Sequence, residues 1–147
     1  MWHLESGAQI KTFTAHLERV RSVTFSPDGK TLASAGNDRA INFWDLNNLE
    51  STPRNILRAH NSRITSLRFS PDGKILASAC DDSTIKLWNA ETGSELKTIQ
   101  GHGTWVKSIS FCPDGKTMGA SHICKNTSSG SFLLPLSFFL LPRSLGP

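Results

Sequence analysis

The sequence lacks several features that mark metal proteins and nucleotide-binding enzymes. It has no tyrosine and only three cysteines in 147 residues, and no two cysteines form a Cys-x-x-Cys pair. Neither a zinc ribbon nor a disulfide framework is therefore indicated, and an odd, sparse set of cysteines fits a reducing compartment. The chain also has no Gly-rich phosphate-binding loop, so we expect no cofactor.

Long apolar stretches are equally scarce. The one candidate runs from Phe132 to Pro142, is interrupted by Pro135 and falls well short of the ~20 residues that span a bilayer. No basic-then-apolar leader opens the chain. We therefore expect no membrane anchor, and residence in the cytoplasm or the nucleus.

The charge is positive but dispersed. Sixteen Lys and Arg residues against 12 Asp and Glu residues give a net charge of +4. The basic residues never form a run of five or six, which disfavours a nucleic-acid partner. A composition of 37% hydrophobic and 19% charged residues is typical of a soluble globular protein.

What the sequence does contain is an internal repeat. A Pro-Asp-Gly-Lys motif preceded by Ser or Cys occurs at residues 26–30, 70–74 and 112–116, at intervals of 44 and 42 residues. The same two intervals separate His16, His60 and His102. Intervals of 42 and 44 separate Trp2, Trp44 and Trp88. Three independent markers therefore share a period of about 43 residues.

Each period has the pattern of four short strands. Val20, Val23 and Phe25 precede a Pro-Asp-Gly turn, in which Pro pre-sets φ and Gly tolerates the conformation that closes the turn. This turn joins the first two strands as an antiparallel pair. The further strands that we predict cover residues 31–35, 40–44, 55–58, 75–79, 84–88 and 95–99.

Four short strands that end in Trp-Asp resemble the WD-repeat family of β-propellers. Trp44-Asp45 carries the pair that names the family, and Trp88-Asn89 departs from it mildly. The resemblance implies an all-β fold of four-stranded antiparallel blades in an incomplete ring. We expect the end of a preceding blade at 1–14, WD repeat 1 at 15–58, WD repeat 2 at 59–100, the start of WD repeat 3 at 101–121, and a non-homologous, disordered apolar tail at 122–147.

Each period also holds Ser, His and Asp, the residue types of a hydrolase triad. In the WD-repeat family, however, such residues join a Trp in a buried hydrogen-bonded tetrad. The matching residues are His16, Ser34, Asp38 and Trp44, and then His60, Ser78, Asp82 and Trp88. The place of the Ser in the third period is taken by Ala120. A protein rarely builds the same active site once per repeat, so we expect no catalytic residues, and histidines on different blades predict no metal site.

Propellers of this family commonly bind partners through side chains that flank the first apolar residue of strand one, and through the residue before the tetrad Asp. This rule selects Arg19, Arg21, Asn37, Arg63, Thr65, Asp81, Trp105 and Lys107. Four of these eight residues are cations, and Arg and Trp often dominate binding energy. The hypothesis is an acidic or phosphorylated protein segment as ligand. The alternative is an ordinary solvated rim.

The resemblance implies a protein-interaction scaffold within a larger complex. One alternative is the sensor propeller of a multidomain signalling nucleotide hydrolase, whose phosphate-binding loop would lie upstream. A role as a cullin-ligase receptor is less favoured, because such WD proteins often carry Arg two residues after the Asp of Trp-Asp, where this chain has Asn47 and Glu91.

The incomplete ring suggests either self-association or a piece of a longer protein. From Ser131 to Pro142 every residue is Ser, Phe, Leu or Pro, the amino acids that codons made only of pyrimidines can encode. A further hypothesis is therefore that the sequence after about Ser121 is translated intron and that the chain is a truncated gene product with no independent function. A natural low-complexity tail is the alternative.

Overall fold

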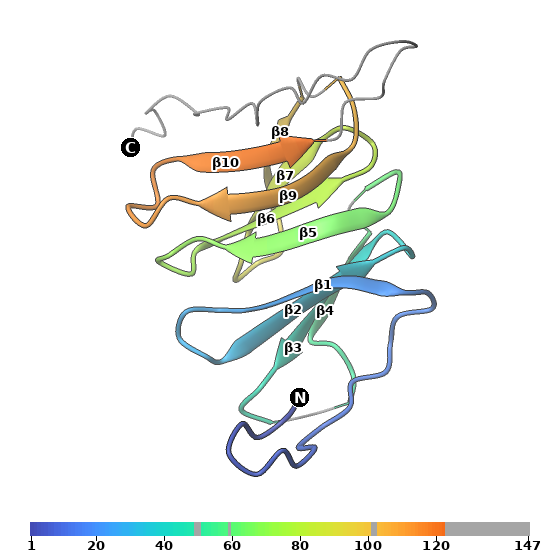
Figure 1. Ribbon diagram of the computed structural model, residues 1–147, viewed down its shortest axis with the longest axis vertical. Helices are drawn as coiled ribbons and strands as arrows, with labels where there is room; N and C mark the ends of the chain where they lie inside the picture. The colour runs from blue at the N-terminus through green and yellow to red at the C-terminus, as the bar shows by residue number, and fades with distance from the viewer. Residues whose placement is uncertain (49–50, 59, 101–102, 123–147) are drawn as a thin grey trace, which may run out of the picture.

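The computed structural model describes residues 1–48, 51–58, 60–100 and 103–122, and all regular elements within them are β-strands. Ten strands form two four-stranded sheets and one two-stranded sheet, and every pairing is antiparallel. The sheets do not close into a ring (Figure 1). The all-β fold class and the four-stranded blades are therefore confirmed. No helix in the described residues is long and apolar enough to cross a membrane.

The sheets follow the repeat. The first, here called blade 1, has the order β1-β2-β3-β4, with β1 at Val20–Phe25, β2 at Thr31–Gly36, β3 at Ala40–Asp45 and β4 at Asn55–Arg58. Blade 2 has the order β5-β6-β7-β8, with β5 at Ile64–Phe69, β6 at Ile75–Cys80, β7 at Ile85–Asn89 and β8 at Glu95–Ile99. The third sheet pairs β9, Val106–Phe111, with β10, Met118–His122.

The Pro-Asp-Gly turns are closed by the side chain before the proline and by the aspartate. In blade 1, Asp28 Oδ1 accepts hydrogen bonds from Ser26 Oγ at 2.5 Å and from the Lys30 N–H at 3.0 Å. The glycine of each turn has a positive φ, which other residues adopt only with strain: Gly29 at 71°, Gly73 at 74° and Gly115 at 68°. The repeated motif therefore specifies the same hairpin three times.

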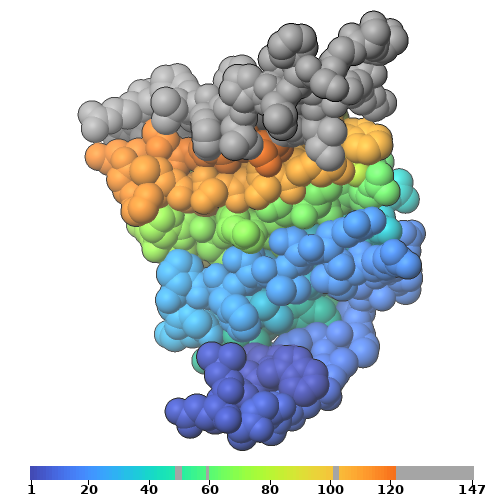
Figure 2. Space-filling view, viewed as in Figure 1, coloured from blue at the N-terminus to red at the C-terminus, as the bar shows by residue number. Residues whose placement is uncertain are grey.

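The blades stack in sequence order along the longest axis of the molecule (Figure 2). Their first strands, β1, β5 and β9, lie side by side (Figure 1). Alanines and branched or aromatic residues of one blade pack against large residues of the next. The core between blades 1 and 2 contains Ala33, Ala35, Ile41, Phe43, Ile64, Leu67, Phe69, Leu76 and Trp88. The core between blade 2 and the third sheet contains Ala77, Ala79, Ile85, Leu87, Val106, Ile109 and Met118.

The face of blade 1 that points away from blade 2, here called its outer flank, is more exposed than the same face of blade 2. Val20, Val23 and Phe25 of β1 are 48%, 55% and 52% exposed, whereas residues at the same places in β5 are 0% to 9% exposed. Blade 1 covers the flank of blade 2, and no strand of the described residues covers the flank of blade 1 in that way. The self-association that an incomplete ring suggests stays a prediction.

The N-terminal segment was expected to be the end of a preceding blade. The structure has one isolated antiparallel bridge there, between Trp2 and Gln9, and places the ring of Phe13 4.8 Å from that of Trp44. This segment therefore covers part of the flank without forming a strand of a sheet. The expected disordered tail lies, after His122, outside the described residues.

Candidate functional site

The structure brings the four tetrad residues of blade 1 together. His16 Nδ1 lies 2.8 Å from Asp38 Oδ2, and His16 Nε2 lies 2.8 Å from Ser34 Oγ. The indole N–H of Trp44 donates to the same Ser34 Oγ at 2.9 Å. Because a carboxylate oxygen accepts, His16 Nδ1 donates to Asp38, and the other ring nitrogen, Nε2, faces the Ser34 hydroxyl.

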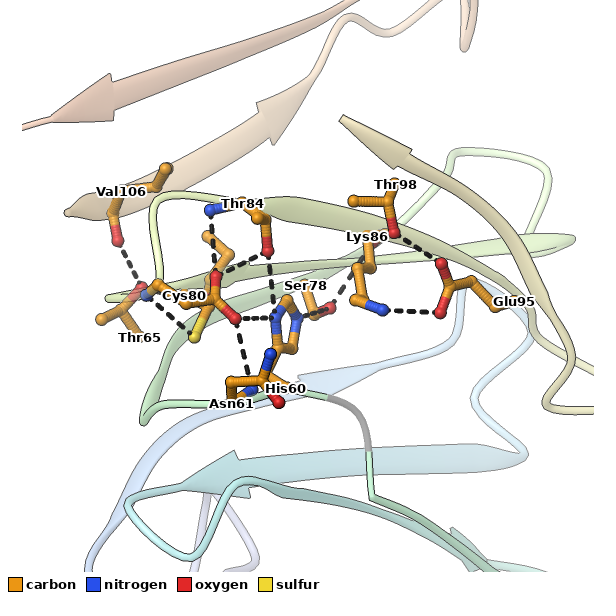
Figure 3. A network of polar contacts seen from close by, with 12 residues as sticks. His60, Asn61, Thr65, Ser78, Cys80, Thr84, Lys86, Glu95, Thr98 and Val106 are labelled. Atoms are coloured by element: carbon orange, nitrogen blue, oxygen red, sulfur yellow. Dashed lines mark hydrogen bonds and ion pairs between the residues drawn. The ribbon is translucent and has the colours of Figure 1, made fainter. Parts of the chain in front are cut away.

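Blade 2 repeats this geometry around His60 (Figure 3). His60 Nδ1 lies 3.1 Å from Asp82 Oδ2, and His60 Nε2 lies 2.7 Å from Ser78 Oγ. The Trp88 indole N–H donates to Ser78 Oγ at 2.9 Å. Thr84 adds a bond that blade 1 lacks, because its hydroxyl donates to Asp82 Oδ1 at 2.6 Å. Each tetrad thus ties the loop before the first strand and the turn after the second strand to the middle of the sheet.

Burial decides what this network can do chemically. Ser78 is fully buried, so its hydroxyl cannot meet a substrate. Burial of the ring lowers the pKa of His60 despite the opposing effect of Asp82. Burial acts to raise the pKa of the Asp82 carboxyl, but the bonds from Thr84 and the nearby His60 outweigh it, and that pKa lies below its ordinary value. A neutral ring bonded to a carboxylate fits an element that stabilises the fold.

Lowering the pH from about 7 to about 5 is expected to reduce the free energy of unfolding. The folded pKa of His60 lies below its ordinary value of 6.5, which the unfolded chain has. The unfolded state therefore binds more protons as the pH falls through about 6.5, and stability present above that pH is lost below it. Urea unfolding followed by circular dichroism across this range measures the effect. An unchanged free energy of unfolding would contradict it.

The two departures from the repeat, Ala120 in place of a serine and Asn89 in place of an aspartate, have different consequences. Ala120 pairs with Ile109 in the register in which Ser34 pairs with Val23, so a methyl group stands where the tetrad hydroxyl would be. His102 lies outside the described residues. The side chain of Asn89, in contrast, makes the same hydrogen bond as that of Asp45. Asp45 Oδ1 accepts the N–H two residues on at 2.9 Å, and Asn89 Oδ1 does so at 3.0 Å.

A second polar cluster joins blade 2 to the third sheet. Asp81 Oδ2 accepts a hydrogen bond from Arg63 Nε, and Asp81 Oδ1 accepts one from Lys107 Nζ at 2.9 Å. Both cations also lie over the ring of Trp105, at 5.5 Å for Arg63 Cζ and 4.7 Å for Lys107 Nζ. We call these four residues the rim cluster. Burial acts to raise the pKa of the Asp81 carboxyl, but the two cations outweigh it and keep that pKa below its ordinary value.

Four other residues were selected from the sequence. Arg19, Arg21 and Asn37 belong to blade 1, and Thr65 lies in β5 of blade 2. Arg19 and Arg21 are exposed, and Arg21 Nε donates to Asn37 Oδ1 at 2.9 Å. The Thr65 hydroxyl bonds to the backbone oxygens of Ala79, at 3.1 Å, and Val106, at 2.6 Å. Thr65 therefore fastens the third sheet to blade 2, whereas the arginines of blade 1 keep their charged ends at the surface.

A shallow hollow of about 370 Å³ opens beside the rim cluster. Its lining residues are Glu18, Asn37, Arg39, Asn61, Ser62, Arg63, Asp81 and Trp105. Four of these residues were selected from the sequence, and four were not: Glu18, Arg39, Asn61 and Ser62. Arg39 directly follows the tetrad Asp38 and has a positive φ of 65°, a conformation that an arginine does not indicate in a sequence.

Comparison with known proteins agrees with this architecture. The family described as WD40, "WD domain, G-beta repeat", matches the chain three times, at residues 7–45, 51–89 and 93–131. The third match runs past residue 121, where the sequence analysis ended the third repeat.

Individual relatives match over short segments. The chain is 40% identical over 52 residues to "Transducin beta-like protein 3" of Bos taurus, covering 35% of the chain and 6% of that protein. It is 50% identical over 40 residues to "Transcriptional repressor tup12" of Schizosaccharomyces pombe, covering 27% and 7%. It is 40% identical over 52 residues to "DDB1- and CUL4-associated factor 13" of Dictyostelium discoideum, covering 35% and 12%. The matched segments thus span only a small part of these relatives, but the three family matches together cover most of the chain, which belongs to the WD40 repeat family.

Proposed function

We propose that this chain binds an acidic or phosphorylated segment of a partner protein at the hollow beside the rim cluster. WD-repeat proteins generally serve as protein-interaction scaffolds and are typically not enzymes, which supports the class of function. The charge around the hollow supports the class of ligand. Arg39 and Arg63 line it together with the acidic Glu18 and Asp81. Two further cations bond to lining residues, Arg21 to Asn37 and Lys107 to Asp81, so positive charges outnumber negative ones by four to two.

The rim cluster is the observation that carries the proposal. Its Asp81 side chain is only 3% exposed and accepts from both Arg63 and Lys107, so one negative charge holds two positive charges in place. The trio therefore keeps one net positive charge at the surface. Cations that are already fixed lose less conformational freedom when they bind a carboxylate or a phosphate. Trp105, 38% exposed, adds a rigid apolar surface next to them.

Exchanging the arginines for acidic residues is expected to weaken this binding strongly. The variant is Arg19→Glu, Arg21→Glu and Arg63→Glu, and the probe is an array of peptides that carry Glu, Asp or phosphoserine, with uncharged peptides of matched sequence. The unaltered chain should retain the acidic peptides more strongly at low salt than at high salt, because exposed charges are screened. The triple variant should lose at least about 10-fold in affinity, since like charges now oppose binding.

The chain offers a matched control. Lys30, Lys74 and Lys116 are exposed, stand in the Pro-Asp-Gly turns at the opposite end of the strands, and give the same change in net charge when replaced by Glu. This control should keep the binding of acidic peptides. An equal loss in both triple variants would show that the overall charge attracts the peptides, and the proposed site would be wrong.

A further inference from the structure

Blade 2 holds a group of metal-ligating side chains whose counterpart in blade 1 is incomplete. His60 lies before β5 and Cys80 ends β6, and Figure 3 shows both side chains. Asp82 stands in the turn between β6 and β7. One ligand atom from each of these residues lies within 4.8 Å of the other two. We propose that His60, Cys80 and Asp82 form a binding site for Zn²⁺.

The three donors are a nitrogen, a sulfur and an oxygen, which is the ligand range that Zn²⁺ uses in proteins. Zinc bonds of about 2.0–2.3 Å place tetrahedral ligands somewhat less than 4 Å apart. His60 Nδ1 and Asp82 Oδ2 are already 3.1 Å apart, so the sulfur of Cys80 is the atom that has to approach, by up to about 1 Å. A water molecule or the Thr84 hydroxyl, which lies 3.3 Å from His60 Nδ1, completes the coordination. Asp82 is 15% exposed and the side chain of His60 is fully buried, so the ion enters past the carboxylate.

The hydrogen bonds around His60 are compatible with the change of tautomer that metal binding requires. When Nδ1 of His60 binds the cation, the ring proton moves to Nε2 and is donated to Ser78 Oγ, 2.7 Å away. Ser78 then turns its own proton towards the Lys86 carbonyl oxygen at 3.5 Å. Burial raises the pKa of the Cys80 thiol to about 12, so the cation itself has to displace that proton, and one proton is released for each cation bound. A hydrogen bond on the second ring nitrogen is the usual orienting partner of a metal-binding histidine.

The Asp82 carboxylate is also held in place. The N–H groups of Asn61 and Thr84 donate to it at 3.3 Å and 3.0 Å. These two bonds come from different loops and fix the direction in which the carboxylate oxygens point. Little further ordering is therefore needed when the ion arrives.

Blade 1 serves as an internal comparison. Its tetrad has the same His and Asp, but Gly36 stands at the place of Cys80 and Ala40 at the place of Thr84. A Cβ atom on Gly36 would lie 2.1 Å from the Arg19 carbonyl oxygen, so blade 1 has no space for a side chain there. The sulfur ligand is therefore a property of blade 2 and is not required by the repeat.

Cobalt(II) is the probe for the test, because a thiolate bound to cobalt gives a near-ultraviolet charge-transfer absorption. The full chain carrying Cys112→Ser and Cys124→Ser has Cys80 as its only thiol and should show this absorption with one cobalt per chain, lost when Zn²⁺ is added. Adding Cys80→Ser should remove the absorption and weaken cobalt binding by more than about 100-fold, with an unchanged circular dichroism spectrum.

Two results would overturn the proposal. One is the absence of thiolate-to-cobalt absorption in the protein whose only thiol is Cys80. The other is absorption that survives Cys80→Ser. The first result does not depend on whether the Cys80→Ser protein folds, because the parent protein already isolates that thiol.

Discussion

Replacing Ser78 with alanine is expected to lower the free energy of unfolding by about 2–5 kcal/mol. The Ser78 oxygen serves two buried nitrogens, His60 Nε2 at 2.7 Å and Trp88 Nε1 at 2.9 Å. Alanine leaves both without this partner, and each unsatisfied buried polar group costs about 1–3 kcal/mol. Equilibrium urea unfolding of the full chain, followed by circular dichroism, measures the change.

The control for this prediction is Ser110→Ala. Ser110 also lies on a strand, β9, but its side chain is exposed. Its replacement should change the free energy of unfolding by less than about 0.5 kcal/mol, as exposed positions usually do. Equal effects of the two substitutions would mean that the buried Ser78 contributes no more to the free energy of unfolding than an exposed serine does.

Leu67→Ala in β5 is expected to cost about 2–5 kcal/mol, whereas Val23→Ala in β1 should cost less than about 1 kcal/mol. The two residues hold the same place in their blades, pairing with Ser78 and Ser34 respectively. Leu67 is fully buried between blades 1 and 2, so its loss leaves a cavity, but Val23 is half exposed on the outer flank. The same urea experiment compares both variants with the unaltered chain.

The measurement should be repeated over a range of protein concentrations. If Val23→Ala costs as much as Leu67→Ala, and the cost grows with concentration, then another molecule covers the flank of blade 1 in solution. That outcome would contradict the small effect predicted for Val23 and would favour self-association.

The features that occur in every blade can be predicted well from the sequence. Strand positions follow from alternating apolar residues and from the Pro-Asp-Gly turns, so the predicted strands agree with the structure to within one residue at each end. The members of the two tetrads were identified through the resemblance to the WD-repeat family, and the structure brings them within hydrogen-bonding distance. Ala120 also lies at the predicted place, because the register of β9 and β10 copies that of the earlier hairpins.

Contacts between blades could not be predicted in this way. Asp81 was selected from its position alone. That its carboxylate is almost fully buried between Arg63 and Lys107 could not be predicted, because this burial depends on how blade 2 packs against the third sheet. The group formed by His60, Cys80 and Asp82 was missed for another reason. His60 and Asp82 repeat in blade 1 as His16 and Asp38, whereas Cys80 has Gly36 at its place, so the repeat drew attention away from a cysteine that occurs in one blade.

The placement of the rim on the first strands has a consequence for how such an array evolves. Ile64 and Val106 are fully buried, while their neighbours Arg63, Trp105 and Lys107 reach the surface. Because neighbouring residues of an extended chain point to opposite faces, the residues that hold the stack and those that the proposed function assigns to a ligand are separate positions at the start of the same strand. After a repeat is duplicated, selection can therefore change the charge of the new copy at these surface positions while the apolar packing of residues such as Ile64 and Val106 is inherited.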